Sequence, residues 1–94
     1  MKQNTKPAAK SVEATLKGRK STHGDFTINA QIAQDLKAVL HASPNWPTLS
    51  ADKKEALEMV MHKAARICTG NPNEPDHWHD ISGYAKLSED RCET

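Results

Sequence analysis

The stretch that decides the fold is ADKKEALEMVMHKAARICT, residues 51–69. Its apolar residues recur at helical spacing, which places them on one side of a helix: Leu57, Val60, Met61, Ala64 and Cys68. Ser50 suits the N-cap, and Gly70 is expected to end the helix in a left-handed conformation. We therefore predict an amphipathic helix over residues 51–69.

Two further helices are predicted on either side of this stretch. Over residues 27–42 the apolar positions again share one face, and Thr27 suits the N-cap. Residues 75–90 begin with Pro75, which is favoured at a first helical position because its missing N–H would be unpaired there. No strand pattern and no repeat is visible. The sequence predicts an all-α protein, a small bundle of about three helices.

The N-terminal segment differs in composition from the rest. Residues 1–20 hold six basic side chains against the single acid Glu13, a net charge of +5, whereas residues 21–94 carry −4. Their large apolar residues are few, chiefly Val12 and Leu16, too few to offset the entropy of ordering. We predict a disordered basic arm over 1–20 and one helical domain over 21–94. No aromatic residue interleaves the basic ones, which favours a solubilising tail, with or without a short helix over residues 11–17, over a nucleic-acid contact.

Composition excludes several classes of protein. None of the apolar runs in the 94 residues approaches the roughly 18 needed to span a bilayer, and the basic N-terminus lacks the apolar core of a secretory signal. The two cysteines, Cys68 and Cys92, fit a reducing compartment and are expected to be small core residues. Three helices make a small core, so we expect self-association into a homo-oligomer.

Two pairs of carboxylates are the first candidates for chemistry. Glu55 and Glu58 lie one turn apart on the helix over 51–69, and Asp76 and Asp80 lie at i, i+4 on the next helix. Such pairs on adjacent helices can hold Mg²⁺, which prefers oxygen ligands. The alternative is that these are ordinary solvated surface charges.

The histidines are weaker candidates for a metal site than the carboxylates. His77 and His79 are the closest pair, but positions i and i+2 point to different sides of a helix and cannot share one zinc ion. The turn His23-Gly24-Asp25-Phe26 precedes the helix over 27–42. Asp25 could cap that helix with Phe26 packed beneath it, or the turn could contact a ligand near the helix N-terminus.

A family resemblance rests on residues taken in chain order. They are THGDF (22–26), NW (45–46), EALEMVMHKAARI (55–67), GNP (70–72) and DHWHDISGYAKL (76–87). Over residues 21–91 this pattern resembles a family of small bacteriophage and prophage proteins of unassigned function. The resemblance implies a cytoplasmic location in a bacterial host. It also suggests a non-enzymatic accessory protein that binds a host protein to counter host defence.

A weaker similarity is to the MazG-like all-α nucleotide pyrophosphohydrolases, in which acidic pairs on adjacent helices bind Mg²⁺ and a nucleoside triphosphate is hydrolysed between its α and β phosphates. This similarity implies a nucleotide-binding, Mg²⁺-dependent protein that could be an enzyme. The residues it implies as metal ligands are Glu55, Glu58 and Asp80, those at phosphate are Lys63 and Arg66, and Tyr84 or Trp78 would contact the base. The pair Asp76 and Asp80 departs from the superfamily, which spaces its second acidic pair at i, i+3. With few helices in the chain, a complete site would need a partner subunit.

Overall fold

The computed structural model describes residues 11–92, and these residues form an all-helical fold. The all-α class is confirmed, but the prediction of about three helices is wrong, because the described residues contain four α-helices and one short 3₁₀ helix. Their bounds are Val12–His23 (α1), Phe26–His41 (α2), Trp46–Thr48 (η1), Ala51–Thr69 (α3) and Pro75–Glu89 (α4). None of the helices in residues 11–92 is both long and apolar enough to cross a membrane.

The fourth helix is α1, which lies in the segment predicted to be a disordered arm. Ser11 caps it by accepting a hydrogen bond from the backbone N–H of Ala14 at 3.0 Å. No residue of α1 is buried, which is why its composition resembled that of a disordered segment. Residues 12–20 of the predicted arm are thus helical, and its residues 1–10 lie outside the described residues.

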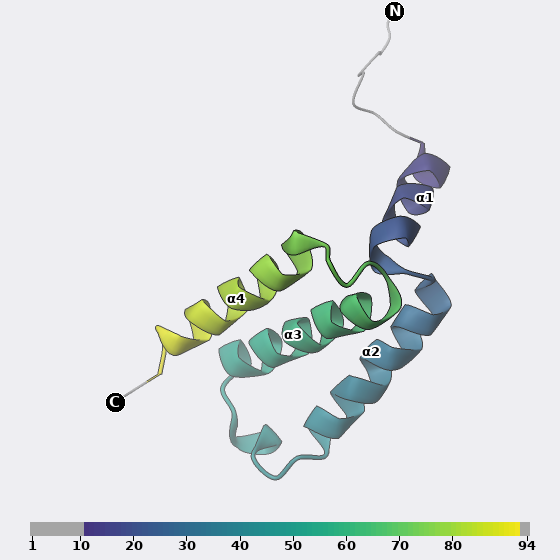
Figure 1. The fold of residues 1–94 in the computed structure, drawn as a ribbon. Coiled ribbons are helices and arrows are strands. Elements are labelled where there is room, and N and C mark those ends of the chain that lie inside the picture. The colour runs from purple at the N-terminus through teal and green to yellow at the C-terminus, as the bar shows by residue number, and fades with distance from the viewer. Residues whose placement is uncertain (1–10, 93–94) are drawn as a thin grey trace, which may run out of the picture.

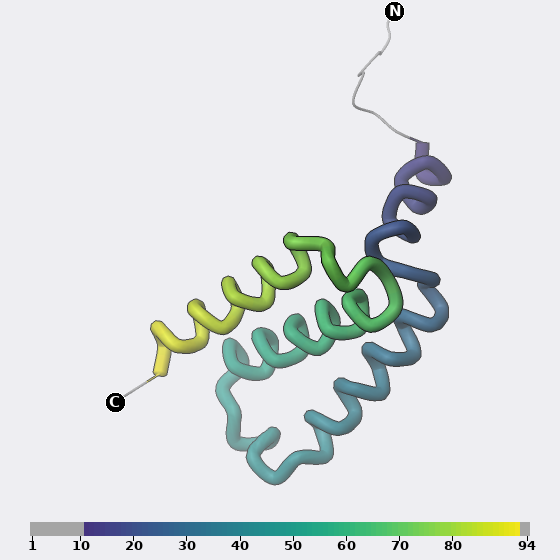
Figure 2. The backbone as a smooth tube through the Cα atoms, viewed as in Figure 1, coloured from purple at the N-terminus to yellow at the C-terminus, as the bar shows by residue number. Residues whose placement is uncertain are grey.

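The other three α-helices form a layer in which α3 lies between α2 and α4 (Figure 1). The chain runs up and down through this layer, so that neighbouring helices are antiparallel. α1 projects beyond one end of the layer, beside the start of α2 and the end of α3 (Figure 2).

The start of α2 is fixed by Asp25. Its Oδ1 accepts hydrogen bonds from the N–H groups of Thr27 at 3.0 Å and Ile28 at 3.2 Å. The capping alternative for Asp25 is therefore confirmed, and α2 begins at Phe26, one residue before the predicted cap Thr27. Phe26 itself is exposed and does not pack beneath the helix, contrary to expectation.

The α1–α2 turn crosses the α3–α4 turn at very close range. The N–H of Asn71 donates to the carbonyl oxygen of Thr22 at 3.0 Å, and the Thr69 hydroxyl donates to that of His23 at 3.0 Å. A methyl group on Gly70 would overlap the Thr22 carbonyl oxygen. Gly70 has φ −112°, so the predicted left-handed conformation is wrong, and the residue is glycine because another backbone touches it.

The fully buried set in residues 11–92 is small and half polar. It consists of Ala33, Ala65, Asn29 and His77. Both polar members are hydrogen-bonded: the Asn29 side-chain amide donates to Thr69 Oγ1 at 3.2 Å, and His77 Nε2 lies 3.1 Å from the carbonyl oxygen of Thr22. Cys68 and Cys92 are exposed, so the expectation that both are core residues is wrong.

Candidate functional site

The four predicted metal ligands lie in different places. Glu58 Oε2 contacts His41 Nε2 of α2 at 2.6 Å. Asp80 Oδ2 is paired with Lys63 Nζ at 2.7 Å, across the groove between α3 and α4. These two carboxylates therefore face neighbours on opposite sides of α3, and each already has a basic partner.

The other two predicted ligands are also separate from each other. Glu55 lines a 230 Å³ hollow between α3 and α4, and Asp76 lies in the exposed first turn of α4. Across residues 11–92, no three His, Cys, Asp or Glu side chains gather closely enough to hold a metal ion. The described residues of one chain thus do not assemble the Mg²⁺ site, which stays a prediction.

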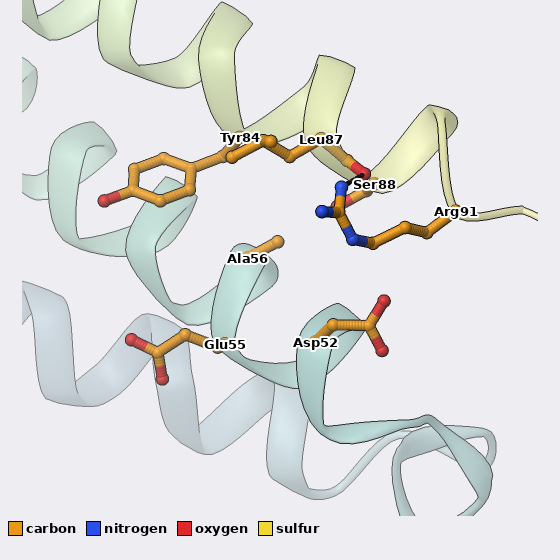
Figure 3. A pocket seen from close by; sticks show the side chains of 7 residues that line it. All are labelled: Asp52, Glu55, Ala56, Tyr84, Leu87, Ser88 and Arg91. Carbon is orange, nitrogen blue, oxygen red and sulfur yellow. Dashed lines mark hydrogen bonds between the residues drawn. The ribbon is translucent and has the colours of Figure 1, made fainter.

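The hollow that contains Glu55 is open, and five of its seven lining residues carry polar or charged side chains. Figure 3 shows the Glu55 carboxylate and the Tyr84 hydroxyl at one end, and the side chains of Asp52 and Arg91 at the other. Its remaining lining comes from Ala56, Leu87 and Ser88. Tyr84, predicted to contact a base, therefore lies on the α4 side of α3, close to Glu55.

A larger cavity of 580 Å³ lies where α1 meets α2 and α3. We call it the cationic pocket, because five of its lining residues are basic or imidazole side chains: Arg19, Lys20, His23, His62 and Arg66. Leu16, Phe26 and Asn29 supply an apolar and amide lining, and Gly24 and Asp25 form its floor at the α1–α2 turn.

Helical spacing on two elements brings these cations together. On α1, residues 16, 19, 20 and 23 recur at i, i+3, i+4 and i+7, which is one face of a helix. On α3, His62 and Arg66 are one turn apart. The α1–α2 turn folds the first face over the second, so cations distant in sequence share one cavity.

Like charges in the cationic pocket depress one another's proton affinity. Burial, and then the charges of Arg66, His77, Arg19 and Lys63, lower the pKa of His23 to about 4. Burial, followed by Arg66 and Lys37, also lowers the pKa of His62. The pKa of Arg66 is lowered as well, by burial and then by Arg19, although a guanidinium remains charged at neutral pH.

Carboxylates do little to neutralise this pocket. Within residues 11–92, neither Arg19 nor Arg66 forms an ion pair with an acidic side chain. The one carboxylate in the lining, Asp25, accepts two N–H groups at the start of α2. The pocket therefore carries an excess of positive charge, offset in part at Arg66 by the charge of Asp80, and this is the electrostatic setting in which an anion is bound.

Of the residues predicted to bind a nucleotide, the structure brings only Arg66 into the cationic pocket. Lys63 is paired with Asp80, and Tyr84 lines the smaller hollow. The sequence analysis did not single out Arg19, Lys20, His23 and His62 for this site. The i, i+3, i+4, i+7 pattern on residues 16–23 was the signal that could have found α1, and its basic composition obscured it.

Fold and site together define a small all-α protein with one layer of three helices and a cationic pocket where a fourth helix meets this layer. Residues 8–92 match the model of a family described as a domain of unknown function, DUF6378. Because the match covers most of the chain, the protein belongs to this family. No curated protein and no solved structure matches the chain.

Proposed function

We propose that this protein binds a small phosphorylated ligand, in the first instance a nucleotide, in the cationic pocket. The observation that carries the proposal is the convergence of Arg19, Lys20 and Arg66 on one cavity without carboxylate partners among the described residues. Bringing unpaired cations together is unfavourable unless an anion offsets their repulsion. A polyphosphate is such an anion.

The pocket suits a nucleotide in size and in chemistry. Its 580 Å³ falls within the roughly 300–1,000 Å³ of small-molecule sites. The planar guanidinium groups of Arg19 and Arg66 can each donate two hydrogen bonds to a phosphate. The exposed ring of Phe26 at the rim offers a face on which a base can stack.

The ionisation of the pocket histidines supports the same assignment. A phosphate beside His23 and His62 would favour their imidazolium forms and raise both pKa values from their lowered positions. Binding would then be accompanied by proton uptake. Affinity for phosphate is expected to rise as the pH falls from 7 towards 5.

Neither magnesium binding nor hydrolysis follows from the cationic pocket. None of Glu55, Glu58, Asp76 and Asp80 lines the cationic pocket, so the residues of a single chain do not fit a shared metal and phosphate site there. We derive no metal-dependent step. The likeness to MazG-like enzymes, the phage origin and the host-protein alternative stay predictions.

The proposal is tested by isothermal titration calorimetry with ATP, dATP and pyrophosphate, each with and without Mg²⁺. We expect saturable binding that weakens about 10- to 100-fold in Arg66→Gln and in Arg19→Gln, since a hydrogen bond to a charged group contributes about 1.5–3 kcal/mol. Lys17→Gln is the matched control, because it removes a charge from α1 outside the pocket. Its affinity should stay within about twofold of the wild type.

Two results would reject a nucleotide pocket. One is the lack of saturable binding to any of the three ligands, and the other is an equal loss of affinity in Lys17→Gln and Arg66→Gln. If pyrophosphate is released from ATP when Mg²⁺ is present and not when it is absent, the protein is an enzyme as well as a nucleotide-binding protein. Binding without turnover would leave a nucleotide-binding protein.

A further inference from the structure

One side of the helical layer presents large apolar side chains to solvent. Ile28 and Val39 on α2 are 56% and 67% exposed, Leu57 on α3 is 38% exposed, and Trp78 on α4 is 55% exposed. We call the surface carrying these four residues the open face.

The open face lies opposite the cationic pocket. Leu57 and Arg66 are nine residues apart, which at 3.6 residues per turn places them about 180° apart around α3. On α2, the charge of Lys37 acts on His62, and Val39 lies about 200° from Lys37. Leu57 and Val39 therefore point away from the pocket side of the layer.

The same reasoning places Trp78 on the open face. Asp80 pairs with Lys63, whose charge acts on both His23 and His62, so Asp80 belongs to the pocket side. Trp78 precedes Asp80 by two residues and lies about 200° from it around α4. All three helices of the layer thus contribute exposed apolar side chains to one surface.

The small core shows that this surface needs a cover whenever the chain is folded. In residues 11–92 the fully buried apolar side chains are two alanines, Ala33 and Ala65. Covering each large side chain stabilises a fold by about 1.5–3 kcal/mol, and stable domains are built from at least two packed layers. A second copy of the chain can provide this cover, because it is present wherever the chain is made.

The size and chemistry of the open face also fit a second copy. Three helices about 9 Å apart and about 22 Å long present roughly 600 Å², close to the approximately 800 Å² per partner of a stable interface. Its four large apolar residues share this side with exposed Asp35 and Glu89, which lie about 20° from Ile28 around α2 and about 20° from Trp78 around α4. The apolar residues would form the core of an interface and these charges its polar rim. We propose that two copies pack open face against open face in a two-fold dimer, which leaves both cationic pockets exposed on the outer surfaces.

The dimer is tested by sedimentation velocity and light scattering of the full chain at 5–100 µM, a range of about 20-fold in concentration. We expect a mass about twice 10.4 kDa for the wild type and a monomer for Leu57→Glu and Val39→Glu. Leu87→Glu is the matched control: Leu87 is also exposed, at 52%, but lies nine residues from Trp78, on the opposite side of α4. It should remain a dimer.

A wild-type monomer at 100 µM overturns the proposal, and so does a dimer that survives both substitutions on the open face. If either variant is unfolded by circular dichroism, the thermal midpoint of the wild type decides the matter. A midpoint that rises with protein concentration supports the dimer, because association stabilises the folded state by mass action. A midpoint independent of concentration overturns it.

Discussion

Replacing Gly70 with alanine should uncouple α1 from the rest of the fold. A methyl group at this position would overlap the carbonyl oxygen of Thr22 and would lie 2.6 Å from the carbonyl carbon of His23. Both obstacles are backbone atoms, so no flexible side chain can move aside. The α1–α2 turn must withdraw from the α3–α4 turn before the variant can fold.

The loss in stability can be worked from the contacts that this withdrawal breaks. The hydrogen bonds from Asn71 N–H to Thr22 and from the Thr69 hydroxyl to His23 each contribute about 1 kcal/mol. Overpacking adds about 1–3 kcal/mol. Alanine restricts the unfolded chain, which returns about 0.4–1 kcal/mol. We expect a net loss of about 2–4 kcal/mol in the free energy of unfolding.

Urea unfolding followed by circular dichroism measures this loss. With a slope of about 1–2 kcal/mol/M, the midpoint of Gly70→Ala should fall by about 2 M. Gly83→Ala is the control, because a methyl group there meets nothing within 4 Å and alanine favours a helix interior by roughly 1 kcal/mol. A Gly70→Ala midpoint equal to that of the wild type would refute the close crossing of the two turns.

Three further predictions follow from individual contacts. The pKa of His23 is lowered to about 4 in the folded chain, so the unfolded chain binds more protons below pH 6.5. The free energy of unfolding should therefore fall as the pH drops from 6.5 to 4. Urea unfolding at pH 7 and pH 5 should show a smaller fall in His23→Gln. Asn29→Ala should destabilise by about 1–2 kcal/mol in the same assay, since it removes the buried amide that donates to the half-buried Thr69 hydroxyl; no change would contradict this role. If Asp80 ligates Mg²⁺, then Mg²⁺ should raise the thermal midpoint of the wild type but not that of Asp80→Asn, whereas no effect on either protein would leave Asp80 as the ion-pair partner of Lys63 alone.

Helical periodicity was sufficient to predict most of the fold. The stripe on residues 51–69 gave α3 with its bounds, and Pro75 gave the start of α4, because apolar spacing and capping are local properties of the chain. α1 was predicted at most as a short helix within the arm, because it buries no residue and its few apolar positions carried no clear stripe.

The candidate site was less accessible to prediction. Spacing placed Glu55 and Glu58 one turn apart along α3, but it could not tell that Glu55 would line the hollow beside α4 while Glu58 contacts His41 on α2. Nor could it tell that Asp80 would pair with Lys63. The cationic pocket needs α1 folded over His62 and Arg66, so its composition depends on tertiary contact. Arg66 was found by resemblance, and the α1 cations emerged only from the three-dimensional structure.

The most direct test of the cationic pocket is histidine NMR during a titration with pyrophosphate. We expect the imidazole resonances of His23 and His62 to shift saturably and the pKa of each to rise, because a bound anion favours the imidazolium form. The resonances of His79, which lies outside the pocket on α4, should not move. Unchanged His23 and His62 resonances at millimolar pyrophosphate would contradict phosphate binding at this site.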